Sequence, residues 1–117
     1  MLYSILQFLF PKLLFRKPQY DFCLYLTFDD GPTPEVTEWV LKTLKTANID
    51  ATFFCLGRQI DAFPSLFEDI KHQGHTIGNH GYEHLNGWKT SKKAYLQNIE
   101  KGYNKTSSKL FRPPYGR

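Results

Sequence analysis

Phe22-Cys-Leu-Tyr-Leu-Thr-Phe28 is an apolar run rich in aromatic and branched side chains, and Asp29-Asp30-Gly31-Pro32 follows it directly. The run predicts a β-strand, and Gly31-Pro32 predicts a sharp turn at its end. Because the turn stops the alternation of side chains, one carboxylate can bind a metal ion while the other accepts a proton. Asp-Asp-Gly-Pro is also a favourable turn sequence without any chemistry, and this alternative stays open on the strand alone.

Helical and extended patterns alternate along the rest of the chain. Thr33 can cap a helix that runs to about Asn48, and the apolar run Ala51–Leu56 predicts a strand buried on both faces. The further expected elements are a helix from Pro64 to Gly74, a brief strand over His75–Gly78, a helix capped by Ser91 and a strand from Lys109. Such alternation predicts an α/β fold, with right-handed βαβ units around a parallel sheet.

Apolar residues recur at helical spacing and mark the faces that we expect to pack on the sheet. They are Val36, Trp39, Val40, Leu44 and Ala47 in the first helix, Leu66, Phe67 and Ile70 in the second, and Ala94, Tyr95, Ile99, Gly102 and Tyr103 in the third. Cys23 and Cys55 each lie in a predicted strand, where we expect buried free thiols rather than a disulfide.

Length and composition limit the class of protein. A chain of 117 residues with 41% hydrophobic and 22% charged residues is typical of one globular domain or part of one. It is short for a barrel in which strands and helices alternate. The net charge is +4 and the basic residues are scattered apart from Lys92-Lys93, so we expect no nucleic-acid partner.

Residues 1–20 form an apolar and basic segment, which we separate from a domain over residues 21–117. Met1–Phe10 is apolar, but it lacks a basic region and a small-residue cleavage site, so we predict no signal peptide. Pro11 and Lys12 interrupt it short of the ~20 apolar residues that a spanning helix needs, so we predict no transmembrane segment. The segment either packs on the domain, which we expect, or contacts a membrane surface. The sequence leaves the compartment and the oligomeric state open.

A second candidate motif follows the third predicted strand. His80-Gly-Tyr-Glu-His84 places two imidazoles four residues apart, where one helical turn brings them to the same face to bind a divalent ion. Asp30 can supply a third ligand; without a carboxylate, two surface histidines would be the better interpretation. Of the other histidines, we expect His75 to be buried and hydrogen-bonded and His72 to be solvated.

A third motif, Arg112-Pro-Pro-Tyr-Gly116, follows the fourth predicted strand. Its two prolines stiffen the backbone, and Arg112 offers a guanidinium fork to a carboxylate. A rigid turn of this kind can hold a backbone N–H toward a developing oxyanion. Pro-Pro-Tyr-Gly is equally an ordinary strand exit, so this motif carries weight only with the other two.

Together, Thr27-Phe-Asp-Asp-Gly-Pro32, His80-Gly-Tyr-Glu-His84 and Arg112-Pro-Pro-Tyr-Gly116 resemble the polysaccharide deacetylase family, the NodB-homology domain of the carbohydrate esterase type. Ala51-Thr-Phe-Phe54 and Gly74-His-Thr-Ile-Gly-Asn79 also resemble it, so the resemblance runs from about Phe22 to Arg117. It implies the N-terminal part of a distorted (β/α) barrel, with parallel strands alternating with helices. Residues 21–117 are then expected to be a partial domain that is truncated at its C-terminus.

The resemblance also implies an activity, the metal-dependent removal of acetyl groups from N-acetylated sugars of a polysaccharide or oligosaccharide. Asp29 would be the general base, and Asp30, His80 and His84 would bind a divalent metal, most often zinc in this family. Arg112 would orient Asp29. Tyr115 would offer its backbone N–H to the oxyanion.

The chain departs from the family pattern in two places. Gly81 stands where the family has Ser or Thr, so we expect a looser loop. Family members also continue through strands that supply a pocket-wall motif and a late histidine as general acid, and no residue here matches either. Two alternatives therefore stay open: a remnant that binds metal or glycan without turnover, and a metal-free carbohydrate-binding module that uses Trp88 and Tyr82 as stacking surfaces.

Overall fold

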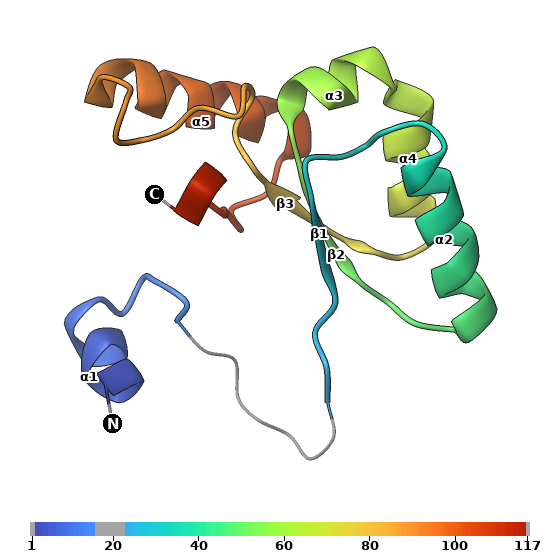
Figure 1. Ribbon diagram of the computed structural model, residues 1–117, viewed down its shortest axis with the longest axis horizontal. Coiled ribbons are helices and arrows are strands. Elements are labelled where there is room, and N and C mark those ends of the chain that lie inside the picture. The colour runs from blue at the N-terminus through green and yellow to red at the C-terminus, as the bar shows by residue number, and fades with distance from the viewer. Residues whose placement is uncertain (1, 16–22, 117) are drawn as a thin grey trace.

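The computed structural model describes residues 2–15 and 23–116 (Figure 1). The expected boundary between residues 20 and 21, Phe22 of the first expected strand and Arg117 lie outside the described residues. The elements are α1 (Leu2–Leu9), β1 (Thr27–Asp29), α2 (Val36–Ala47), β2 (Thr52–Cys55), α3 (Gly57–Ala62), α4 (Pro64–His72), β3 (Thr76–Asn79), α5 (Lys92–Thr106) and the short 3-10 helix η1 (Pro114–Gly116). Within the described ranges, no helix has the length and apolar character that crossing a bilayer requires.

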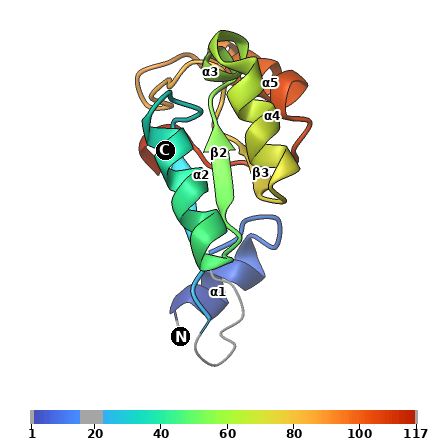
Figure 2. The ribbon, with the colours of Figure 1, turned by 90° about the vertical axis from the view of Figure 1, so that its right-hand side faces the viewer.

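The strands form one parallel sheet in the order β1-β2-β3, as expected for an α/β fold. Thr27 pairs with Thr52, and Thr52 pairs with Thr76. Figures 1 and 2 show α2 and α4 on the same side of the sheet and α5 next to the end of β3. Because parallel strands all end at the same edge of a sheet, the loops that follow β1 and β3 are brought together there.

The central strand β2 anchors the core. Phe53, Phe54 and Cys55 on this strand are buried, which confirms the expectation of a strand covered on both faces. The core cluster consists of Leu41, Leu44, Ala51, Phe53, Cys55, Ile60, Leu66, Phe67 and Ile70. Burial raises the pKa of the Cys55 thiol to about 12, so Cys55 is a packing residue rather than a nucleophile.

The first strand is shorter than the sequence suggested. β1 pairs only over Thr27–Asp29, because its neighbour β2 begins at Thr52 and offers no partner further back. The chain before β1 is therefore exposed, including Leu24 and Cys23. Both cysteines are free as expected, but the expectation that Cys23 is buried is wrong.

Helix α2 begins later than expected, and its buried face is shifted from the expected one, although Leu44 is buried and Val40 packs against the core as expected. The N–H of Thr33 donates to Oγ1 of Thr37 at 2.8 Å, and the N-cap is Glu35, whose φ is 63°. The buried residues are Thr37, Leu41 and Leu44, whereas Val36 and Trp39 are exposed, Trp39 by 66%. The face is displaced because burial follows the i, i+4, i+7 series from Thr37. The end is as expected, with Asn48 in a left-handed C-cap.

Three later elements also differ in detail. The six-residue helix α3 was not expected, because its sequence has too few apolar positions for a helical period. Ser91 does cap α5, accepting the N–H of Ala94, and Gly102 is buried as expected. The other buried residues, Asn98 and Thr106, were not expected, and Tyr103 is exposed. The expected fourth strand is reduced to one bridge between Asn79 and Phe111.

Candidate metal centre

The two adjacent aspartates have different backbone conformations. Asp29 is the last residue of β1, and Asp30 has a φ of 70°, in the left-handed region that few residues other than glycine adopt. This backbone conformation breaks the alternation of the strand. Strained conformations of this kind are concentrated at functional sites, where surrounding contacts hold them.

His80 follows β3 directly, and His84 follows it in a loop rather than on the helical turn that the four-residue spacing suggested. The chain reverses at Gly81, whose φ is 85°. The reversal still brings the two rings together, with centroids 5.1 Å apart. His80 and His84 thus lie together as expected, but the prediction that a helical turn brings them together is wrong.

Asp30, His80 and His84 converge on one point. Oδ1 of Asp30 lies 3.5 Å from Nε2 of His80 and 3.3 Å from Nε2 of His84, and one donor atom from each residue lies within 4.8 Å of the others. Four ligands at 2.0–2.1 Å around a tetrahedral zinc ion stand about 3.4 Å apart, so this donor set fits zinc. Within the described residues no other cluster of histidine, cysteine or carboxylate side chains meets the same criterion.

The imidazole of His80 is oriented by a backbone group. Its Nδ1 lies 2.7 Å from the carbonyl oxygen of Arg112. Since a carbonyl can only accept, Nδ1 carries the hydrogen, and in the neutral ring the lone pair is on Nε2, the nitrogen that faces Asp30. Histidines that bind a metal through one ring nitrogen usually donate the N–H of the other to a group such as this carbonyl. His80 is also buried, which limits the freedom of its ring.

The side chain of Arg112 holds the other aspartate. Its Nη1 donates to Oδ1 of Asp29 at 2.7 Å and to Oγ1 of Thr27 at 3.0 Å. The guanidinium carbon lies 4.0 Å from the centre of the Phe54 ring, which supports it from below. Asp29 is therefore held in an ion pair with Arg112, whereas Asp30 contacts His80 and His84.

Tyr115 lies close to the cluster as well. Its φ is 57°, in the left-handed region, and the short turn around it is closed by a hydrogen bond from the N–H of Gly116 to the carbonyl of Pro113. Its ring packs edge-on against His84, with centroids 4.5 Å apart. Within residues 2–15 and 23–116 its backbone N–H has no hydrogen-bond acceptor. A donor of this kind is available to a ligand.

Two asparagines whose roles the sequence did not predict hold residues 80–84, which we call the histidine loop. Asn79 accepts the N–H of Gly81 with Oδ1 at 2.8 Å and donates from Nδ2 to the carbonyl of Ile99 on α5. Asn98 binds both backbone groups of Glu83, at 2.7 and 2.9 Å. Asn79 was visible in the Gly74–Asn79 motif, but nothing in the helical pattern of α5 distinguished Asn98.

Gly81 is a requirement of this packing. A Cβ at Gly81 would lie 2.7 Å from Nδ2 of Asn98, and the positive φ disfavours a side chain. The carbonyl of Gly81 also accepts the N–H of Gly57 at 2.9 Å. The expectation that glycine makes this loop looser does not hold, because the loop is hydrogen-bonded to α3, β3 and α5.

Tyr82 and Trp88, the proposed stacking pair, have different surroundings. The hydroxyl of Tyr82 donates to Asp61 at 2.9 Å, and Nζ of Lys101 lies 3.4 Å from the ring centre. That face of Tyr82 is therefore covered and cannot stack on a sugar ring. Trp88 is 81% exposed.

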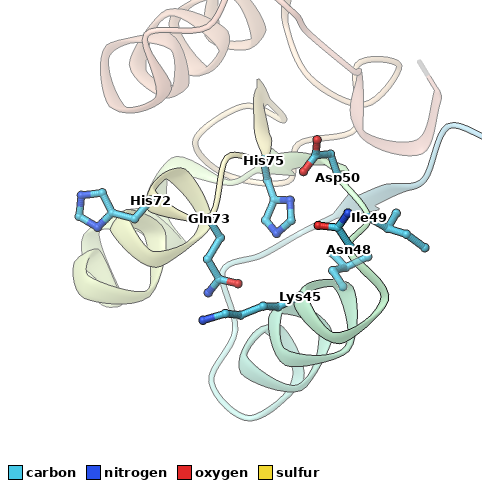
Figure 3. Close-up of a pocket in the computed structure, with 8 residues that line it drawn as sticks. Lys45, Asn48, Ile49, Asp50, His72, Gln73 and His75 are labelled. Carbon is cyan, nitrogen blue, oxygen red and sulfur yellow. The ribbon is translucent and has the colours of Figure 1, made fainter.

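The two remaining histidines lie at the other edge of the sheet. His75 precedes β3, and with His72, Lys45 and Asp50 it lines a pocket of about 250 Å³ (Figure 3). His75 is only 8% exposed, its Nδ1 accepts the N–H of Ala51 at 3.4 Å, and burial lowers its pKa. The expected burial of His75 and exposure of His72 are confirmed.

Comparison with known proteins gives a consistent result. The sequence profile of the family described as "Polysaccharide deacetylase" matches residues 16–117. A peptidoglycan-N-acetylglucosamine deacetylase of Bacillus cereus is 43% identical over 100 residues, which are 78% of this chain and 35% of that protein. The chain thus spans about a third of the length of this relative.

Solved structures resemble the fold closely. A peptidoglycan N-acetylglucosamine deacetylase superposes with a TM-score of 0.77 at 40% identity, over 80% of this chain and 46% of that chain. A family 4 carbohydrate esterase from Streptomyces lividans, in complex with acetate, gives 0.75 at 31% identity, over 80% and 52%. The expected fold class, the N-terminal part of a (β/α) barrel, is confirmed.

Proposed function

The chain belongs to the polysaccharide deacetylase family, and from this we propose that it acts as a metal-dependent hydrolase that removes acetyl groups from N-acetylated sugars of a polysaccharide. The observation that carries the proposal is the meeting of two arrangements at one edge of the sheet. Asp30, His80 and His84 converge there, and Asp29 is held beside them by Arg112. The relatives are named for the removal of acetyl groups from N-acetylglucosamine in peptidoglycan, which supports the same reacting group here.

We propose that Asp30, His80 and His84 hold a divalent metal, with zinc favoured by the two imidazoles and the single carboxylate. When bound, such an ion polarises the acetyl carbonyl and lowers the pKa of a water molecule. His80 contributes its lone pair because its other ring nitrogen is bound to the carbonyl of Arg112.

Asp29 is proposed as the general base. Its Oδ1 is occupied by Arg112, which leaves Oδ2 to accept a proton from the attacking water. Arg112 fixes the direction of the carboxylate through a charge-assisted hydrogen bond. Asp29 and Asp30 then have separate tasks, since one takes a proton and the other binds the ion.

Tyr115 is proposed as the oxyanion donor. Attack of water on the acetyl carbon places negative charge on the carbonyl oxygen, and a fixed N–H directed at that oxygen stabilises it. The Tyr115 N–H fits because it lies in a closed turn against His84 and has no acceptor within the described part of the chain. The sugar nitrogen must then gain a proton as the carbon–nitrogen bond breaks and acetate leaves.

A second candidate function is binding of metal or glycan without turnover. It is favoured by one observation: Asp30, His80 and His84 converge by themselves, and holding an ion needs no proton donor. The metal site is common to both candidates.

Acetate release from N-acetylglucosamine oligomers separates the two. The 117-residue protein carrying one equivalent of zinc is expected to release acetate, to stop when a chelator removes the ion and to resume when zinc is restored. Zinc bound at one equivalent without acetate release would contradict the hydrolase and support the binding protein. A failure to bind zinc at neutral pH would contradict both.

A further inference from the structure

The N-terminal hook, residues 2–15, is built differently from the rest of the molecule. It consists of α1 and a turn that folds back on the helix. Gln7 closes the hook, because its Nε2 donates to the carbonyl of Leu13 at 2.8 Å and its Oε1 accepts the N–H of Phe15 at 3.4 Å. The backbone of the turn is thus partly satisfied from within the hook by a single polar side chain.

Large apolar side chains point outward from this hook. Phe8 is 84% exposed, and the other exposed members are Ile5, Leu9, Phe10, Leu13, Leu14 and Phe15. Figures 1 and 2 show α1 below the sheet and its covering helices. The expectation that this segment packs on the domain is wrong for these side chains. A polar residue lies inside the hook and apolar ones outside, the reverse of a globular core.

The charge of the segment is of one sign. Residues 1–20 contain Lys12, Arg16 and Lys17 but no aspartate or glutamate, and all 11 acidic residues lie further along the chain. Lys12 is exposed on the turn of the hook, between apolar residues on both sides. Apolar side chains with basic neighbours and no acidic ones complement a bilayer surface that contains anionic lipid.

We propose that the N-terminal hook is a membrane-surface anchor that inserts its apolar side chains into the interface of an anionic phospholipid bilayer. An eight-residue helix is about 12 Å long at 1.5 Å per residue, against about 30 Å for the hydrocarbon core, so α1 lies in the interface rather than across it. Closure by Gln7 lowers the cost of insertion, since fewer backbone groups lose water without a partner. The proposal does not depend on acetyl hydrolysis.

Sedimentation of the full 117-residue chain with sucrose-loaded vesicles tests the proposal. The protein is expected to bind vesicles that contain equal parts of phosphatidylglycerol and phosphatidylcholine, and to bind pure phosphatidylcholine more weakly. Phe8→Ser with Leu14→Ser should lower the partition coefficient at least about tenfold through lost apolar burial. Lys12→Glu should lower it about fivefold or more on the anionic vesicles alone.

Trp39→Ser is the matched control, because Trp39 is a similarly exposed apolar residue on α2. It should leave vesicle binding unchanged, and circular dichroism should show that all variants remain folded. Three results would overturn the proposal: wild-type protein that stays in the supernatant, equal losses in the Trp39 and Phe8 variants, or a hook that instead drives self-association. The last would identify a second copy of the chain as the occupant of this surface.

Discussion

Arg112 connects the two halves of the site through two different groups: its side chain donates to Asp29 at 2.7 Å, and its backbone carbonyl lies 2.7 Å from Nδ1 of His80. One residue therefore orients both the proposed base and a proposed metal ligand. The two functions can be separated by mutation, because a change of side chain removes the first contact and leaves the second.

Arg112→Lys should lower acetate release about tenfold to a hundredfold and leave zinc affinity near that of the wild type. Lysine keeps the charge but lacks the planar guanidinium, whose Nη1 donates to both Asp29 and Thr27 while its central carbon lies over the Phe54 ring. Acetate production and zinc titration measure the two effects on one preparation. Arg58→Lys is the control, since the Arg58 side chain forms an exposed ion pair with Glu83 that lysine can keep. Equal loss of zinc binding and turnover would contradict the separation.

Asn98→Ala should weaken zinc binding about tenfold, although Asn98 touches no ligand atom. It is buried and satisfies both backbone groups of Glu83 in the histidine loop. Loss of supports of this kind typically costs a metal site tenfold or more. The free energy of unfolding of the metal-free protein should also fall, by about 1–3 kcal/mol. Asn104→Ala, on the exposed side of α5, should change neither quantity.

The contrast between Arg112 and Asn98 shows which parts of the site the sequence could predict. The proposed site residues lie at or after the ends of the expected strands and belong to motifs, so a parallel sheet was expected to bring them together. They are Asp29, Asp30, His80, His84 and Arg112. Gly102 was expected on the packing face of α5 and is buried there. Asn98 was not, because helical periodicity contains no information about the contact between α5 and the histidine loop. The same limit explains why β1 was expected to be longer, since its length is set by β2 rather than by its own residues.

Gly102→Ala should destabilise the protein by about 2 kcal/mol or more, against the gain of about 1 kcal/mol that alanine normally brings to a helix. A Cβ at Gly102 would lie 2.6 Å from the backbone carbon of Gly81, in addition to a clash with Asn79. Chemical denaturation measures the change. Gly74 has a positive φ but open space around it, so Gly74→Ala should lower the free energy of unfolding by only about 1 kcal/mol. A neutral or stabilising Gly102→Ala would show that α5 does not pack this closely.

His75 should make stability fall in mild acid. Burial lowers the pKa of His75, although Asp50 opposes this effect, so the folded protein accepts this proton at lower pH than the unfolded chain. The unfolded state therefore binds more protons between the two pKa values. The free energy of unfolding should decrease as the pH falls below about 6.5, with a slope of at most about 1.4 kcal/mol for each pH unit.

Denaturation of the metal-free protein between about pH 7 and pH 5, with a chelator present, measures this dependence. His75→Gln should reduce the slope, whereas His72→Gln should leave it unchanged because His72 is exposed. A slope that survives in His75→Gln would assign the acid sensitivity to other groups.

The division of tasks between Asp29 and Asp30 is tested most directly by zinc titration of Asp29→Asn and Asp30→Asn in parallel with the wild type. Asp30→Asn removes one of the three proposed ligands and should weaken zinc binding about a hundredfold or more. Asp29→Asn removes a carboxylate whose contacts are to Arg112, and it should bind zinc within about twofold of the wild type while releasing no acetate. Equal zinc affinity in the two variants, or a larger loss in Asp29→Asn, would contradict this division of tasks.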